Sequence, residues 1–139
     1  MTITTMLALV GLMACAPLII ERAYTEASAI FVGRVVSTKS VKTGPGMDEV
    51  HTVATLRVQR VWKGPRSTVI EVKTCGGRVS EQVETICTVG ANYRVGTSYL
   101  VLAFGESLDT SQCATRPLDE SIDELLWLAS KPSQRIEDR

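Results

Sequence analysis

Apolar and polar residues alternate along residues 53–64, VATLRVQRVWKG, as they do in a β-strand with one buried face. Every second residue of its first half is apolar, namely Ala54, Leu56 and Val58. The next apolar positions are Val61 and Trp62, so the alternation slips by one residue. An extra residue in a strand produces such a slip. The pattern predicts a bulge near residues 59–60, a bent sheet, and a strand end at the Gly-Pro turn of residues 64–65.

Similar patterns predict four further strands, at residues 29–41, 67–74, 99–104 and 108–115, the last of them the weakest. Gly33 lies inside the first of these and marks either a bulge or a close approach of another chain segment. The turn sequence TGPG at residues 43–46 predicts a hairpin between the first two strands. Residues 78–96 show no clear period, so we expect little regular structure there.

Short helices are expected at both ends of the sheet. Residues 19–28 combine helix formers with apolar residues at helical spacing. A second helix is expected to begin at Pro117 and to end before Pro132. Its expected apolar stripe comprises Leu118, Ile122, Leu125, Leu126 and Ala129. Five short strands between two short helices favour a mainly β, five-stranded barrel over a sandwich.

The charge and composition of the chain exclude some functions. Its 139 residues suit a single domain. The 15 basic and 15 acidic side chains cancel and are spread along the chain, so no charge excess attracts nucleic acid or an acidic membrane. Aromatic residues make up only 5%, too few to suggest a base-stacking platform. We therefore expect no nucleic-acid partner.

The first 20 residues carry no charged side chain. Their most apolar part, residues 6–14, has the length of a signal-peptide core. A membrane span needs about 20 apolar residues, and Pro17 and several threonines disfavour one. We therefore expect residues 1–14 to be a leader and the protein to be secreted, periplasmic or held in the cell envelope. A buried N-terminal segment is the alternative, since no basic residue precedes the apolar run.

The four cysteines, Cys15, Cys75, Cys87 and Cys113, are widely separated, and the chain has one histidine, His51. Structural zinc sites use closely spaced ligands, so we expect no metal site and no cofactor. In an exported chain these cysteines are expected to form disulfides, and four cysteines allow three pairings. A single histidine without an evident nucleophile or phosphate loop forms no catalytic set, so we do not expect an enzyme.

Cys15 has a second interpretation. Residues 12–15, LMAC, are close to the sequence at which bacterial prolipoproteins are cleaved and lipidated on cysteine. Lipidation would attach the protein to a membrane and leave three cysteines, an odd number that oxidising compartments disfavour. A lipid anchor on Cys15 therefore stays an alternative to a disulfide.

Four segments resemble bacterial exported proteins grouped with the tissue inhibitors of metalloproteinases (TIMPs) and netrin modules: FVGRVV (31–36), LRVQRVWKG (56–64), VGTSYLVLA (95–103) and TSQCATRPL (110–118). The likeness covers about residues 15 to 128. It implies an oligonucleotide/oligosaccharide-binding (OB) type Greek-key barrel tied by disulfides. We place this domain at residues 15–131 and a polar tail at residues 132–139.

The resemblance also implies a disulfide pairing. The animal inhibitors begin with Cys-x-Cys-x-Pro, and residues 13–17, MACAP, match this pattern with methionine in place of the first cysteine. Cys15 then corresponds to the second cysteine, which in the family is bridged to the last strand. The resemblance thus implies a bridge between Cys15 and Cys113, and leaves Cys75 to pair with Cys87.

Three functions follow as hypotheses. The first is an exported, disulfide-stabilised binding or structural module without catalytic activity, whose partner is an extracytoplasmic protein. The second is a metalloprotease inhibitor, a partner implied by the resemblance alone, with Cys15, Ala16 and Pro17 as the contacting N-terminus and the amine of Cys15 as a zinc ligand. The third is a barrel that binds an oligosaccharide or another ligand. The sequence gives no indication of the oligomeric state.

Overall fold

The structure, a computed structural model, describes residues 19–43, 49–87 and 90–136. The predicted leader, residues 1–14, and the residues Cys15, Ala16 and Pro17 lie outside this part of the chain. The helices are α2 (Ile20–Glu26), the 3-10 helix η1 (Leu118–Glu120) and α3 (Ile122–Leu128). The strands are β1 (Ala29–Lys42), β2 (Val50–Lys63), β3 (Val69–Cys75), β4 (Gly77–Arg78), β5 (Glu84–Thr85), β6 (Ser98–Ala103), β7 (Asp109–Thr110), β8 (Thr115–Pro117) and β9 (Gln134–Arg135).

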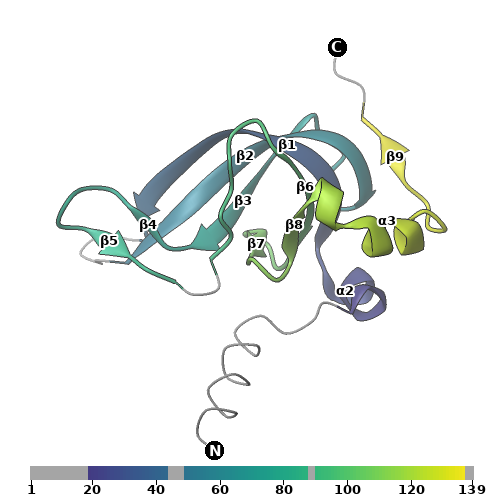
Figure 1. Ribbon diagram of the computed structural model, residues 1–139, viewed down its shortest axis with the longest axis horizontal. Coiled ribbons are helices and arrows are strands. Elements are labelled where there is room, and N and C mark those ends of the chain that lie inside the picture. The colour runs from purple at the N-terminus through teal and green to yellow at the C-terminus, as the bar shows by residue number, and fades with distance from the viewer. Residues whose placement is uncertain (1–18, 44–48, 88–89, 137–139) are drawn as a thin grey trace, which may run out of the picture.

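The fold is mainly β, with a short helix at each end of the chain, as the sequence predicts (Figure 1). A main sheet in the order β7-β3-β2-β1-β6-β8 curls into a half-barrel. Strand β7 pairs in parallel with β3, and an antiparallel bridge joins Asp109 of β7 to Phe104, directly after β6. The path β1-β2-β3-β7-β6 therefore returns to β1, as expected for a partly open OB-type barrel. No helix in the described ranges is long and apolar enough to cross a bilayer.

The predicted fifth strand, residues 108–115, is instead two short strands in the structure, β7 and β8. A turn separates them, in which Ala114 N–H donates to the Ser111 carbonyl at 3.0 Å and Cys113 N–H donates to Ser111 Oγ at 3.3 Å. The turn lets β7 pair with β3 while β8 pairs with β6. The small strands β4, β5 and β9 also raise the strand number above the predicted five.

The predicted bulge in the second strand is confirmed. Gln59 is the extra residue of β2, because β1 pairs on either side of it with Val58 and Arg60. Trp62 is a second extra residue, closer to the end of the strand. Val58 and Val61 consequently both belong to the barrel core, whereas Trp62 packs toward the helices. Bulges increase the local twist, and two in one strand help a small sheet to curl.

Two apolar cores lie on opposite faces of the sheet. The barrel core includes Phe31, Val35, Leu56, Val72, Tyr99 and Val101. The outer core fills the space between the back of β1 and β6 and the helices, and includes Ile20, Ile30, Val32, Leu100, Leu102 and Leu128. Both faces of the first half of β1 are therefore buried. This is why the sequence there is a continuous apolar run with no alternation.

The predicted apolar stripe of the last helix is partly wrong. Ile122 and Leu126 are 63% and 69% exposed, whereas Leu128 is fully buried. Residues 118–120 form a 3-10 helix, so the α-helix begins only at Ile122 and buries a different face. Because a 3-10 turn advances the chain by three residues per turn and an α turn by 3.6, the change of helix type rotates every later side chain.

The end of the chain is attached to the barrel. Strand β9 pairs with β2 through Gln134 and Arg135. Ile136 N–H donates to the Gln59 carbonyl at 2.9 Å, and its side chain packs against the barrel core. The described part of the predicted polar tail, residues 132–136, therefore covers the bulged end of β2 and contributes a short edge strand.

Candidate functional site

A cavity of about 960 Å³ opens between the loop of residues 91–97, strand β8 and helix η1. Its polar lining includes Asn92, Arg94, Gln112, Arg116, Asp119 and Glu120. We refer to this surface as the polar groove. It offers two guanidinium groups, two carboxylates and two side-chain amides, a set that can donate to carboxylates or carbonyls and accept from ammonium or amide groups. Within the described ranges, no group of three or more His, Cys, Asp or Glu side chains could hold a metal ion.

Tyr99 of β6 fixes one wall of the polar groove. Its hydroxyl accepts a hydrogen bond from Arg94 N–H at 2.8 Å and donates to the Asn92 carbonyl at 3.4 Å. The ring of Tyr93 packs edge-on against that of Tyr99, with centroids 5.1 Å apart and an interplanar angle of 84°. A loop with little secondary structure is thus held against the barrel at three points, so Asn92 and Arg94 extend from a fixed backbone.

Tyr93 extends this wall into a hydroxyl network. Its hydroxyl lies 3.0 Å from Thr115 Oγ1, which lies 2.8 Å from Thr110 Oγ1. Thr110 in turn donates to the Leu102 carbonyl at 2.8 Å. Burial is the main cause that raises the pKa of Tyr93 from 10.0 to about 12, against the smaller opposite effect of the hydrogen bond with Thr115. The network connects the loop, β6, β7 and β8 at the base of the groove.

The raised pKa of Tyr93 makes stability depend on pH in the alkaline range. The folded protein keeps the phenol proton between pH 10 and about 12, where the unfolded chain loses it. The resulting contribution of Tyr93 to the free energy of unfolding is complete below about pH 10. It is lost as the pH rises through about 12, at about 1.4 kcal/mol per pH unit. Urea unfolding at several alkaline pH values is expected to show this slope, and Tyr93→Phe is expected to reduce it. Equal slopes in the two proteins would contradict the assignment.

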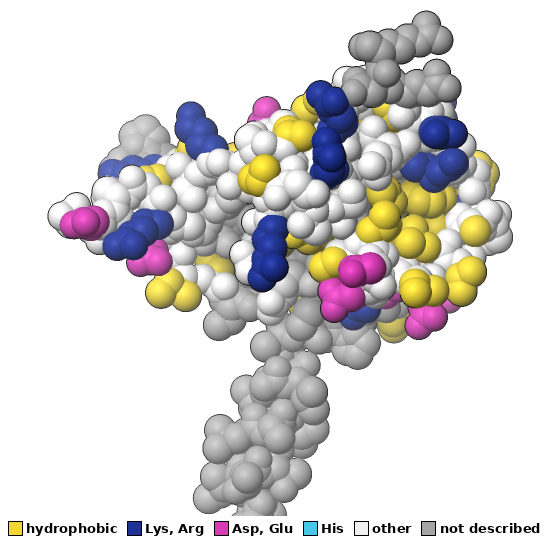
Figure 2. All heavy atoms as spheres, turned by 45° about the horizontal axis from the view of Figure 1, so that its top comes forward, with side chains coloured by type: hydrophobic (Ala, Val, Ile, Leu, Met, Phe, Trp, Pro, Cys, Tyr) yellow, Lys and Arg dark blue, Asp and Glu magenta, His cyan; other side chains and the backbone are white. Residues whose placement is uncertain are grey.

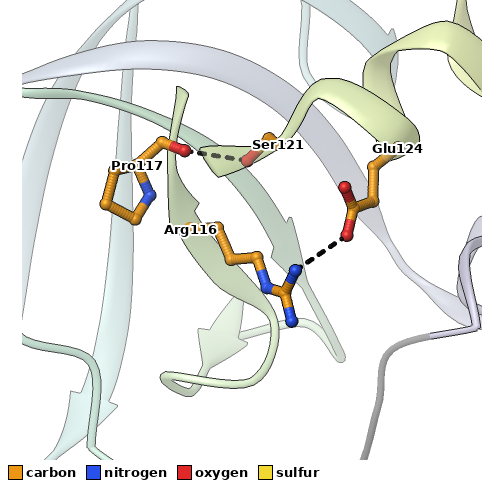
Figure 3. A network of polar contacts seen from close by, with 4 residues as sticks. All are labelled: Arg116, Pro117, Ser121 and Glu124. Atoms are coloured by element: carbon orange, nitrogen blue, oxygen red, sulfur yellow. Dashed lines mark hydrogen bonds and ion pairs between the residues drawn. The ribbon is translucent and has the colours of Figure 1, made fainter. Parts of the chain in front are cut away.

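A second network holds η1 and α3 against β8 (Figure 3). Arg116 and Glu124 form an ion pair with an Nη1 to Oε1 distance of 3.1 Å, and Ser121 Oγ donates to the Pro117 carbonyl at 2.9 Å. Glu124 is nearly buried and Ser121 is fully buried, so both polar groups are satisfied inside the protein. The network fixes the 3-10 turn that places Asp119 and Glu120 on the rim of the polar groove.

Cys75 and Cys87 form a disulfide, with Cα atoms 5.8 Å apart, as the resemblance implies. The bridge ties the end of β3 to the chain after β5. Cys113, in the turn before β8, is also disulfide-bonded. Its partner by the resemblance, Cys15, lies outside the described residues, as do Ala16 and Pro17. Cys113 directly follows Gln112, which lines the polar groove, so the disulfide of Cys113 holds the chain next to the wall of the groove.

Removal of the Cys75–Cys87 bridge is expected to destabilise the protein. The bridge closes a loop with a sequence separation of 12, and the loss of such a cross-link costs about 2–3 kcal/mol through the greater entropy of the unfolded chain. Urea unfolding of the double variant Cys75→Ala/Cys87→Ala and of the oxidised protein measures this cost. The substitution leaves the disulfide of Cys113 intact, whereas a reducing agent would not. An unchanged unfolding midpoint would contradict it.

Sequence reasoning did not identify the polar groove. The sequence predicts little regular structure over residues 78–96, and in their described part, residues 78–87 and 90–96, the structure has no regular element beyond the short strands β4 and β5. This segment contributes to the polar groove because Tyr93 and Tyr99 hold its loop against β8 and β6. Such contacts between distant residues leave no pattern in the local sequence. The cluster Asn92-Tyr93-Arg94 within a loop was the available signal, because polar and aromatic residues on loops often carry function.

Comparison with known proteins adds no relative. No family model matches the chain, and no curated protein matches it significantly. The function must therefore be argued from the geometry of the site.

Proposed function

We propose that this chain is an exported binding module of the TIMP and netrin-like type, without catalytic activity of its own, and that the polar groove contacts its partner. The OB-type path of the sheet, the helix at each end of the chain and the Cys75–Cys87 bridge support the class. The observation that carries the proposal is the wide polar groove on a fixed frame. Its wall and rim are held by Tyr99 and by the Arg116–Glu124 ion pair.

The chemistry of the groove favours a polypeptide segment as its ligand. Asn92 and Gln112 offer amides that match a peptide backbone, and charged side chains of both signs surround them. Sugars and bases usually stack on exposed aromatic rings in such sites. Among the described residues that line the groove, the one aromatic residue is Tyr99, which is only 4% exposed, so its ring offers no stacking face. An oligosaccharide is accordingly the weaker candidate.

Affinity measurements with a groove variant test the proposal. The mature protein is immobilised and exposed to extracytoplasmic proteins from its source, and to a glycan array in parallel. Each retained ligand is then titrated with the unmodified protein and with Asn92→Ala/Arg94→Glu. We expect a protein ligand whose affinity falls at least about tenfold, the effect of losing one charge-assisted contact. The matched control is Glu84→Lys on β5, which reverses the charge of an exposed residue that does not line the groove. Equal affinities for all three proteins would reject the groove as the site, and retention of glycans alone would reject a protein partner.

Inhibition of a zinc metalloprotease is the second candidate function. The position of Cys113 beside Gln112 favours it, because a bridge from Cys113 to Cys15 would hold the mature N-terminus at the polar groove. Intact-mass analysis of the protein from its native compartment gives the N-terminus, any lipid and the number of bridges. If Cys15 is the unmodified N-terminus, we expect inhibition within a panel of purified zinc proteases that N-acetylation abolishes. A lipidated Cys15, or an N-terminus elsewhere, would remove this candidate.

A further inference from the structure

An apolar groove of about 350 Å³ borders η1 through Leu118, as the polar groove does through Asp119 and Glu120. Val32 and Trp62, on the outer face of the sheet, form one wall, and Leu118 and Leu125 form the other. The Trp62 indole N–H donates to the Leu128 carbonyl at 3.0 Å, so the ring is fixed in place. Figure 2 shows the hydrophobic side chains gathered on the right of the molecule.

The exposed face of α3 extends this apolar surface. Ile122 and Leu126 are one helical turn apart, and each exposes more than 60% of its area. The helix already buries a different face against the barrel, so these two side chains contribute nothing to the core. Adjacent exposed aliphatic residues beside an apolar groove are typical of a contact surface.

The two rims of the apolar groove carry opposite charges. Arg60 and Arg135 lie opposite each other in the β2–β9 pair and line one edge. Arg60 donates to the Ser133 hydroxyl at 2.7 Å, and neither arginine pairs with a carboxylate among the described residues. At the other edge Leu118 shares a second hollow with Asp119. Figure 2 shows basic side chains above the hydrophobic patch and acidic ones below it.

We infer that the apolar groove and the exposed face of α3 form an interface between two copies of this chain. A two-fold axis through the groove places the basic rim of one copy over the acidic rim of the other, and the apolar surfaces face each other. A partner of a single charge sign would meet one rim of like charge. The net charge of zero also removes the long-range repulsion that would keep copies apart. Asp119 borders both grooves, but Asn92 and Arg94 do not line the apolar groove and Leu126 does not line the polar groove, so variants at these positions test the two proposals separately.

Sedimentation velocity of the full mature protein over a range of concentrations tests this inference. We expect a dimer that dissociates on dilution, and at least about a tenfold weaker dimer for Leu126→Glu. The matched control is Ile86→Glu, because Ile86 is 85% exposed and lies outside the apolar surface. A protein that stays monomeric at the highest soluble concentration would overturn the inference, as would a Leu126→Glu variant that dimerises as well as the control.

Charge reversal tests the two-fold arrangement itself. Arg135→Glu and Asp119→Arg should each weaken the dimer, because each places like charges face to face across the axis. The double variant restores opposite charges at positions 119 and 135 across the axis and is expected to dimerise more strongly than either single variant. Additive weakening in the double variant would overturn the two-fold pairing of these rims.

Discussion

Replacement of Gly64 by alanine is expected to lower the free energy of unfolding by about 3–5 kcal/mol. Gly64 ends β2 with a φ of +100°, which side-chain-bearing residues rarely adopt. An added Cβ would also lie 2.8 Å from Ala29 Cβ, 2.9 Å from Ala29 Cα and 3.0 Å from the Ser28 carbonyl oxygen. Two of these contacts are to backbone, and Ala29 is fully buried in the barrel core, so neither can move without opening the start of β1.

Urea unfolding of Gly64→Ala and Gly96→Ala separates the cost of backbone strain at a positive φ from the cost of the Cβ clash. Gly96 has a φ of +91°, but an added Cβ there would meet nothing within 4 Å. Gly96→Ala should therefore cost only the backbone strain, about 1–2 kcal/mol. Equal losses in the two variants would mean that the packing of Gly64 against Ala29 is not as described.

Replacement of Phe31 by alanine is expected to cost about 3–5 kcal/mol. Phe31 is the largest of the fully buried side chains, and it lies in the barrel core between β2 and β6, where its Cα partners are Val61 and Val101. The ring also packs close to Gly33, since a Cβ on Gly33 would lie 3.3 Å from Phe31 Cε2. No neighbouring side chain can fill the space without moving a strand.

Equilibrium unfolding in urea measures the effect of Phe31→Ala, with Val36→Ala as the control. Val36 lies on the same strand but is exposed and outside both cores, so its truncation should change stability by less than about 0.5 kcal/mol. A loss below about 1 kcal/mol for Phe31→Ala would show that the barrel core is not packed around this ring.

The features that the sequence predicted correctly all depend on local patterns. The slip between Val58 and Val61 predicts a bulge because strand alternation has a period of two, and the structure has the extra residue at Gln59. Gly33 marks a close approach, because a Cβ there would lie 3.1 Å from the Arg57 carbonyl oxygen and 3.2 Å from Leu56 Cβ. The mainly β class and the terminal helices follow from the same kind of signal.

The features that the sequence did not predict depend on contacts between distant residues. The turn at Ser111 divides the predicted fifth strand, because its two halves pair with strands on opposite sides of the barrel. The 3-10 turn at residues 118–120 is stabilised by the ion pair of Arg116 with Glu124, and it rotates Ile122 out of the core. The polar groove likewise combines residues 91–97 with β8, which a pattern along the chain cannot connect.

Amide hydrogen exchange of the protein with and without its captured partner tests the central claim most directly. We expect slower exchange on binding for the loop of residues 91–97 and for residues 116–120, the segments that contribute Asn92, Arg94, Arg116, Asp119 and Glu120 to the lining of the polar groove. We expect no change on binding for β4 and β5, which contribute no residue to the groove lining. Slower exchange confined to β4 and β5, with the loop and η1 unchanged, would contradict the claim that the polar groove is the binding surface.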